Sequence, residues 1–311
     1  MSRMAWIVIV AAALLAGCPD RPERTDGSGK VRVVASLFPL ADLAGRIGGA
    51  DAEVACLLQA GQTPHDFRPN AAQAERCAEA DLIVLVGLGI DAWAADAARA
   101  SRGRAEVLRL AECADLWMPV LAPDDKDNHT DAHDGHGEAP SDPHVWLDPV
   151  YMQSFARAIA DALIAARPAA RDGFVRRRDA VLADLKALDA EYRTVLAAVA
   201  GKHFVTFHPA FSYVARRYGL VQMSLHTADA AGFGPEHMEQ VADFVRRHRV
   251  RAILAEPQFP PDKLRALARA TGAAVGQLDP LGNPDRPGYD SYLAMMRSNL
   301  AALAGALKDQ P

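Results

Sequence analysis

Three histidines and one aspartate stand beside prolines at four separate places in the chain. They are His65 in TPHDF, His144 in DPHVW, His208 in FHPAF and Asp279 in LDPLG. Proline fixes its own φ and pushes the preceding residue out of the helical region, so these side chains start from stiff backbone. Three imidazoles and one carboxylate suit tetrahedral zinc, whereas manganese, magnesium and calcium prefer mostly oxygen. The sequence therefore predicts a zinc site, although copper and nickel also suit imidazole.

A second group of histidines lies in an acidic, glycine-containing segment, residues 124–142. This segment holds seven acids against one lysine, a local charge of −6 in a chain whose net charge is −5. The composition is typical of a disordered loop, in which flexible side chains hold zinc weakly and raise its concentration near the main site. A solvated insertion without a metal role is the alternative. The histidines concerned are His129, His133 and His136.

Other polar residues are candidates for supporting roles. Asp66 and Glu256 lie close to ligand motifs, where either carboxylate could accept the second ring N–H of a histidine and orient it toward a metal. Four further histidines lie in or beside expected helices, strands or loops without a stiff strand end. We interpret these as structural or exposed: His203, His226, His237 and His248.

The first 18 residues have the pattern of an export signal. Arg3 precedes an apolar run, residues 5–16, that is too short to remain as a membrane-spanning helix. The run ends in Leu-Ala-Gly-Cys, which resembles a bacterial lipobox and makes Cys18 the lipid attachment site. Plain cleavage, with Cys18 an ordinary residue, is the alternative. Residues 19–30, rich in proline, glycine and charge, predict a flexible tether to an extracytoplasmic folded part.

Cysteine and charge usage exclude other classes of site. Cys56, Cys77 and Cys113 remain after Cys18, so one disulfide is possible and its pairing stays open. The sequence has neither CxxC nor zinc-finger spacing. A basic stripe with interleaved aromatic residues is also absent, so we expect no nucleic-acid partner.

Strand and helix patterns alternate on both sides of one long helical region. This predicts an α/β fold of two lobes, each a sheet of βα repeats with flanking helices. The first lobe covers residues 31–167 and the second residues 201–311. Residues 168–200 predict a rigid linking helix of about 45 Å, at 1.5 Å per residue, which should limit the lobes to small rocking motions. Open parallel sheets bind ligands at the carboxyl ends of their strands, so we expect the metal site in the cleft between lobes.

Five motifs occur in the order found in a known family. PHDF, DPHVWLDP, HPAFSYVARRYGL, AEPQFPPDKLRALA and LDPLG resemble those of the solute-binding proteins of metal-ion ABC transporters, the cluster A-I metal-binding lipoproteins, and their zinc-binding subgroup in particular. The resemblance covers nearly the whole folded chain. It implies that the first lobe binds the metal through His65 and His144, and the second through His208 and Asp279.

Two details of the sequence bear on that resemblance. Manganese-selective relatives commonly carry glutamate at the position of His208, which agrees with the preference of imidazole for zinc. The histidine-rich loop is short and carries three histidines. Some zinc-binding members have a disulfide in the second lobe, but no cysteine of this chain lies beyond Cys113.

The resemblance implies a zinc-capture protein of the periplasm or cell surface. Such a protein is a monomer that delivers Zn²⁺ to an ABC permease in the inner membrane for import, and a metallochaperone is a possible further partner. The alternatives are a carrier of manganese, iron or another divalent metal, a surface adhesin and a secreted zinc hydrolase. A hydrolase needs an open coordination position and a general base, but four protein ligands fill the site and HExxH is absent. We therefore expect no enzyme activity.

Overall fold

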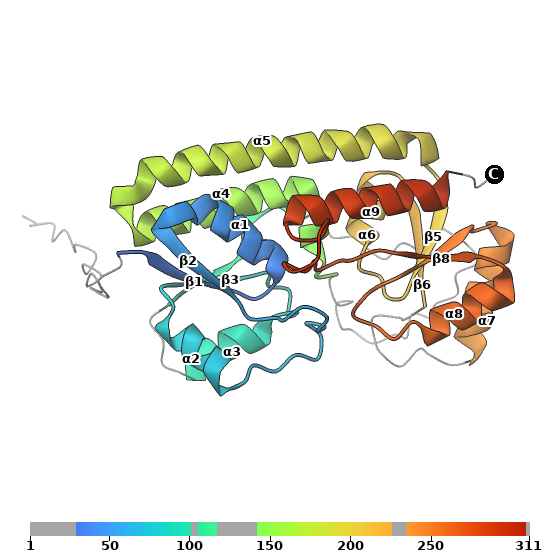
Figure 1. Ribbon diagram of the computed structural model, residues 1–311, viewed down its shortest axis with the longest axis horizontal. Helices are drawn as coiled ribbons and strands as arrows, with labels where there is room; N and C mark the ends of the chain where they lie inside the picture. The colour runs from blue at the N-terminus through green and yellow to red at the C-terminus, as the bar shows by residue number, and fades with distance from the viewer. Residues whose placement is uncertain (1–28, 101–104, 117–141, 226–234, 309–311) are drawn as a thin grey trace, which may run out of the picture.

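The computed structural model describes residues 29–100, 105–116, 142–225 and 235–308, which form two lobes beneath long helices (Figure 1). The expected export signal, residues 1–18 with Cys18, lies outside these ranges, as does most of the tether. The histidine-rich loop also lies outside them up to residue 141. The histidines outside the described residues are His129, His133, His136 and His226.

The first lobe contains a parallel sheet in the order β2-β1-β3-β4. Its central strand β3 reads LIVL and is buried on both faces, as expected for a strand with helices on either side. Helix α2 begins with a capping box in which the Asn70 and Gln73 side chains each accept from the other's backbone N–H. The elements are β1 (Val31–Ala35), α1 (Phe38–Gly48), β2 (Ala52–Cys56), α2 (Ala71–Glu79), β3 (Leu82–Leu85), α3 (Ala92–Ala100) and β4 (Glu106–Arg109).

The second lobe repeats the arrangement with a parallel sheet in the order β6-β5-β7-β8. Helix α8 ends at Gly272, whose φ of 74° is the left-handed conformation that glycine adopts without strain. Strand β6 does not appear among the sequence expectations, because VQMS is short and partly polar. The elements are β5 (His203–Thr206), α6 (Ser212–Arg217), β6 (Val221–Ser224), α7 (Pro235–Arg247), β7 (Ala252–Ala255), α8 (Asp262–Thr271), β8 (Ala274–Gln277) and α9 (Tyr292–Leu307).

Three long helices cover both lobes. Helix α4 (Pro149–Ala166) is followed by α5 (Arg171–Leu196), which runs above both sheets in Figure 1. Short 3-10 turns flank α5, so the linking region extends from residue 168 to residue 199 as expected. Helix α9, the last element of the second lobe, packs against α5 and α1 as well as against that lobe's sheet. The Tyr192 hydroxyl donates to the Met296 carbonyl at 2.6 Å and joins α5 to α9.

Residues 142–151, which we name the crossing segment, bind the first lobe to the second. The Trp146 indole donates to the Pro280 carbonyl at 2.7 Å, and the Tyr292 hydroxyl donates to the Trp146 carbonyl at 2.9 Å. Buried Asp148 pairs with Arg217 of α6. These contacts join lobe to lobe close to the carboxyl ends of the second sheet.

Two further features concern the whole described chain. None of its helices is both long and apolar enough to cross a membrane. Cys56, Cys77 and Cys113 are free thiols in this structure, so it forms none of the disulfides that the sequence left open.

Replacing Arg217 by glutamine leaves the buried Asp148 carboxylate without its cation. Because an uncompensated buried charge is strongly destabilising, we expect Arg217→Gln to lower the free energy of unfolding by about 3–5 kcal/mol. Urea unfolding followed by circular dichroism measures the loss. Arg99→Gln, which breaks an exposed pair with Asp96, is the matched control and should change the free energy by at most about 1 kcal/mol. Equal effects of the two substitutions would contradict the importance of the pair with Asp148.

Candidate metal centre

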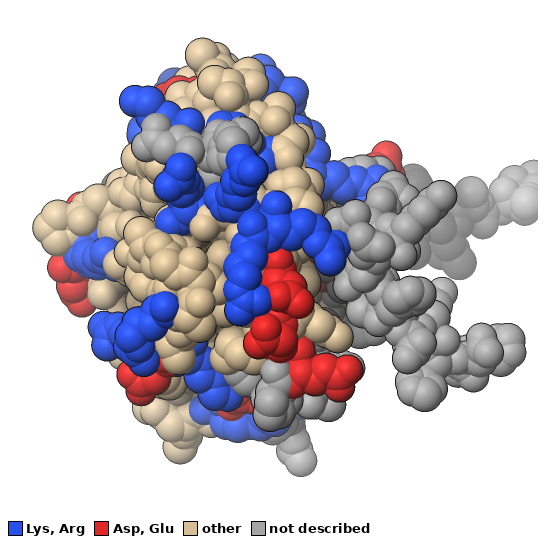
Figure 2. All heavy atoms as spheres, turned by 90° about the vertical axis from the view of Figure 1, so that its right-hand side faces the viewer, with Lys and Arg blue, Asp and Glu red and all other residues tan. Residues whose placement is uncertain are grey.

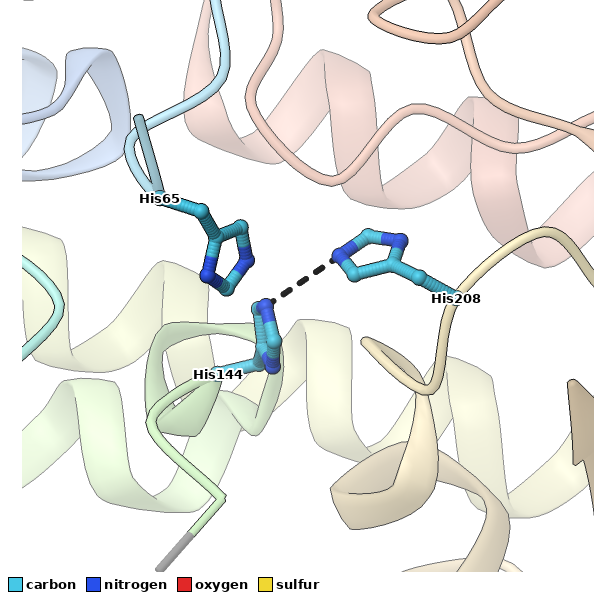
Figure 3. A group of neighbouring side chains, drawn as sticks. All are labelled: His65, His144 and His208. Carbon is cyan, nitrogen blue, oxygen red and sulfur yellow. Dashed lines mark hydrogen bonds between the residues drawn. The ribbon is translucent and has the colours of Figure 1, made fainter. Parts of the chain in front are cut away.

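Three histidines from three distant parts of the chain point toward one another (Figure 3). Each offers a ring nitrogen, and these nitrogens all lie within 4.8 Å of one another. His65 comes from the loop between β2 and α2, His144 from the crossing segment, and His208 from the residues that follow β5. The structure thus brings together three of the four residues expected to bind a metal.

The spacing of two of these nitrogens matches that of zinc ligands. Nε2 of His208 and Nε2 of His144 are 3.3 Å apart. Two nitrogens bound to one tetrahedral zinc at about 2.0–2.1 Å lie about 3.3–3.4 Å from each other. The pair therefore already has the separation that a shared zinc ion requires.

His144 is oriented by a carboxylate two residues before it. Oδ1 of Asp142 lies 2.7 Å from Nδ1 of His144 and also accepts the His144 backbone N–H at 2.9 Å. The Ser212 hydroxyl donates to the other oxygen of Asp142, and the Tyr213 hydroxyl donates to its carbonyl at 2.7 Å. A carboxylate on one ring nitrogen turns the other toward the metal and makes it more basic. Nε2 of His144 consequently faces the centre.

His208 has a corresponding partner in Glu256. Oε2 of Glu256 is 2.6 Å from Nδ1 of His208, an ion-pair distance, although the angle does not meet that of a hydrogen bond. Oε1 of Glu256 accepts the His208 backbone N–H at 3.1 Å. The Thr206 hydroxyl donates to the His208 carbonyl at 2.7 Å, which fixes the backbone as well. Glu256 therefore contacts the ring nitrogen of His208 that faces away from His144.

His65 is exposed, unlike His144 and His208. Its loop is attached to the first lobe through Trp93, whose indole donates to the carbonyls of Pro64 and Ile90 at 3.2 and 3.1 Å. The cavity between the histidines measures ≈ 10 Å³, and His65 is the one exposed histidine among the three that line it. Its lining residues are Thr63, Pro64, His65, His144, Trp146, His208, Gln258, Phe259, Pro280 and Leu281.

Asp279 is not part of the histidine group in this structure. It lies at the end of β8, buried, and Oδ1 accepts the backbone N–H groups of Leu281 and Gly282 at 3.0 and 2.9 Å. The neighbouring residues Pro280 and Leu281 do line the cavity. Its carboxylate is therefore fixed beside the site, without the close approach to the histidines that the sequence led us to expect.

The other polar residues considered from the sequence lie outside the three-histidine group. Asp66, which the sequence suggested as a supporting carboxylate, is exposed. Asp142, which it did not single out, contacts Nδ1 of His144. The DPH spacing in the sequence was the available signal, because an aspartate two residues before a histidine can accept that residue's backbone N–H. His203 stacks on His248 with ring centroids 3.9 Å apart, away from the three-histidine group.

The lowered pKa of Asp142 makes the free energy of unfolding depend on pH in the acidic range. Burial alone would raise this pKa, but the charge of His144 and the hydrogen bonds from His144 and Ser212 outweigh burial and lower it. A carboxyl with a lowered folded-state pKa contributes stability above its unfolded value of about 3.9. That stability disappears as pH falls through the folded value.

We therefore expect Asp142→Asn to be less stable than the wild type at neutral pH, with the difference shrinking below about pH 4. Urea unfolding of metal-free protein across a pH series measures this difference. Asp179→Asn, at an exposed carboxylate on α5, is the control and should give a curve parallel to that of the wild type. A deficit in Asp142→Asn that stayed constant down to pH 2 would contradict the role of its ionised form.

Comparison with known proteins supports the same type of site. The zinc-binding protein AdcA of Streptococcus pyogenes serotype M6 is 28% identical over 288 residues, which are 88% of this chain and 56% of that relative. The chain thus spans about half the length of AdcA. A Treponema pallidum protein named for metal binding is 32% identical over 100% of this chain and 96% of its own length.

A solved structure and a family model extend the comparison to the fold and to nearly the whole chain. The crystal structure of a ZnuA deletion mutant with zinc bound has a TM-score of 0.77 and 26% identity, covering 91% of this chain and 100% of that one. Both have two parallel-sheet lobes joined by a long helix. The family model described as zinc-uptake complex component A, periplasmic, matches residues 33–306. Because this match includes both lobes and all three clustered histidines, the chain belongs to the ZnuA family.

Proposed function

We propose that this protein captures Zn²⁺ outside the cytoplasm and delivers it to an ABC-type permease for import. The observation that carries the proposal is the group of three imidazoles around one small cavity, with two Nε2 atoms at the 3.3 Å separation of shared zinc ligands. We assign His65, His144 and His208 as metal ligands and Asp279 as the fourth. The similarity to zinc-binding AdcA and to zinc-bound ZnuA supports the same cargo.

The surroundings of the histidines favour zinc over manganese or iron. Nitrogen donors outnumber oxygen donors in the assigned set, and imidazole suits zinc better than it suits manganese. Asp142 and Glu256 contact the ring nitrogens that face away from the centre, which strengthens the nitrogens that face it. Asp279 can complete a tetrahedron through Oδ2, because Oδ1 is already occupied by backbone N–H groups.

The shape of the site favours transport over catalysis. A zinc hydrolase needs an open coordination position and room for a substrate beside the ion. The cavity here measures ≈ 10 Å³, about the space of one water molecule, and buried side chains enclose two of the three histidines. We infer that the site holds an ion alone and has no enzymatic activity.

We propose that Cys18 carries a lipid and that residues 19–30 tether the lobes to the membrane surface. We also propose that the protein acts as a monomer. The permease in the inner membrane is then within reach of the protein that loads it.

The ligand assignment can be tested by direct metal binding. We expect one tightly bound Zn²⁺ per purified chain, with weaker binding of Mn²⁺ in competition. Loss of a hydrogen-bonding partner behind a ligand typically lowers metal affinity about 10–100-fold. We expect His208→Ala, which removes a ligand itself, to lower the zinc affinity by more than this. His237→Ala, whose ring bonds to the Ser224 carbonyl away from the site, is the matched control. Retention of one tight zinc in His208→Ala would contradict the assignment.

The acidic loop that precedes His144 can be tested separately. If His129, His133 and His136 gather zinc, deletion of residues 125–139 should slow uptake at low zinc while leaving the affinity of the tight site unchanged. Growth and zinc uptake at limiting zinc, with isothermal titration of the purified variant, separate the two effects. Unchanged uptake would show that the loop is a solvated insertion.

A further inference from the structure

The Asp279 carboxylate is anchored through one of its two oxygens. Besides the backbone N–H groups of Leu281 and Gly282, Oδ1 accepts the side-chain amide of Gln258 at 3.1 Å. Asp279 is 2% exposed, so these bonds are shielded from solvent. With three donors directed at Oδ1, Oδ2 is the oxygen that remains for a metal ion or for a cation of the protein.

The protein's own cation at this place is Arg286. Its Nη1 is 3.8 Å from Oδ2 of Asp279, within the range of an ion pair but beyond that of a hydrogen bond. The guanidinium is held in place from two sides. Nη2 donates to Oε1 of Gln277 at 3.2 Å, and Cζ lies 3.9 Å from the ring centroid of Tyr289. Both contacts are made to protein groups outside the assigned ligand set, and they hold the guanidinium beside the carboxylate.

A fixed positive charge beside a ligand carboxylate opposes the binding of a dication in two ways. It attracts the same oxygen that the metal needs, and it repels the ion. Water moderates the effect, because the Arg286 side chain is 38% exposed. The result is an affinity below the value that the four ligands alone would give.

We propose that Arg286 tunes the site by weakening its hold on the metal through Asp279. This inference rests on the proposed function, with Asp279 as the fourth ligand. A carrier that must pass its ion to an acceptor needs an affinity below the maximum, and a charge outside the ligand set lowers affinity without altering the ligands. The effect is electrostatic, so it acts on every divalent ion by a similar factor and leaves the preference for zinc to the histidines.

Three substitutions test this role by zinc titration in competition with a chelator. Arg286→Gln should bind Zn²⁺ about 3–10-fold more tightly than the wild type, and should bind Mn²⁺ more tightly by a similar factor. Arg286→Lys keeps the charge and should stay near the wild-type affinity. Arg297→Gln, which removes an exposed arginine paired with Glu191, is the matched control and should not change the affinity.

A double-variant cycle shows whether Arg286 acts through Asp279. In an Asp279→Asn background, Arg286→Gln should give a smaller gain, because the carboxylate for which arginine and metal compete is gone. The gain in the Asp279 protein should also shrink as salt rises, as screened charges require. A gain that is salt-independent or of equal size in both backgrounds would overturn the proposal.

The outcomes separate this inference from the function on which it rests. A wild-type protein without a tight zinc site would overturn the proposed function. A wild type that binds one zinc, with Arg286→Gln unchanged or weaker, would overturn only the role of Arg286. A change in the ratio of zinc to manganese affinity would show that the residue shapes the ligand geometry, and this too would overturn an electrostatic role.

Discussion

The metal centre depends on the bonds that hold the crossing segment, residues 142–151, against the second lobe. Tyr213 and Tyr292 donate to its carbonyls, and the indole of Trp146 donates to a carbonyl of the loop after β8. Hydrogen bonds therefore join the segment that carries His144 to the lobe that carries His208, although His144 precedes the linking helix in sequence. The Nε2 atoms of the two histidines lie 3.3 Å apart. A preorganised pair reduces the ordering that binding would otherwise require.

The other two assigned ligands are held differently. His65 is exposed on a loop attached to the first lobe by Trp93, and Asp279 is anchored by Oδ1 at the end of β8. We infer that an ion binds His144 and His208 first. Small movements of the His65 loop and of the Asp279 side chain would then complete its coordination. Helix α5 runs above both lobes in Figure 1, and α9 contacts α1 of the first lobe as well as the second sheet, so such local adjustments suit the structure better than a wide hinge motion. The long helix in the sequence led to the same expectation.

The architecture was predictable where local patterns and tertiary packing agree. The apolar run of β3, the Asn70 cap and the glycine after α8 each indicate their element without help from the rest of the chain. Strand β6 was missed because its four residues are half polar and it forms at the sheet edge only by pairing with β5. The packing of α9 on α1 of the first lobe could not be predicted either, because the apolar pattern of a helix does not indicate which element it will contact.

The site shows the same limit at the level of single side chains. Proline-flanked histidines could be recognised from sequence because stiffness is a local property. The acceptors behind them were harder to assign: Glu256 was foreseen and Asp142 was counted with the acidic loop, because a carboxylate's partner is decided in three dimensions. Arg286 has no sequence signature, since its closeness to Asp279 depends on a turn stabilised by stacking on Tyr289.

Charged groups around the three histidines have opposite effects on metal binding: two carboxylates favour it and one arginine disfavours it. Asp142 and Glu256 contact the outer ring nitrogens of His144 and His208, whereas Arg286 lies beside Asp279, the carboxylate that we propose as the fourth ligand. The two carboxylates act on nitrogen ligands, so they strengthen binding mainly for metals that accept nitrogen. The arginine acts through charge and weakens every dication alike. Selectivity and affinity are therefore controlled by different residues, so a ZnuA-type site can hold zinc in preference to other ions and still release it.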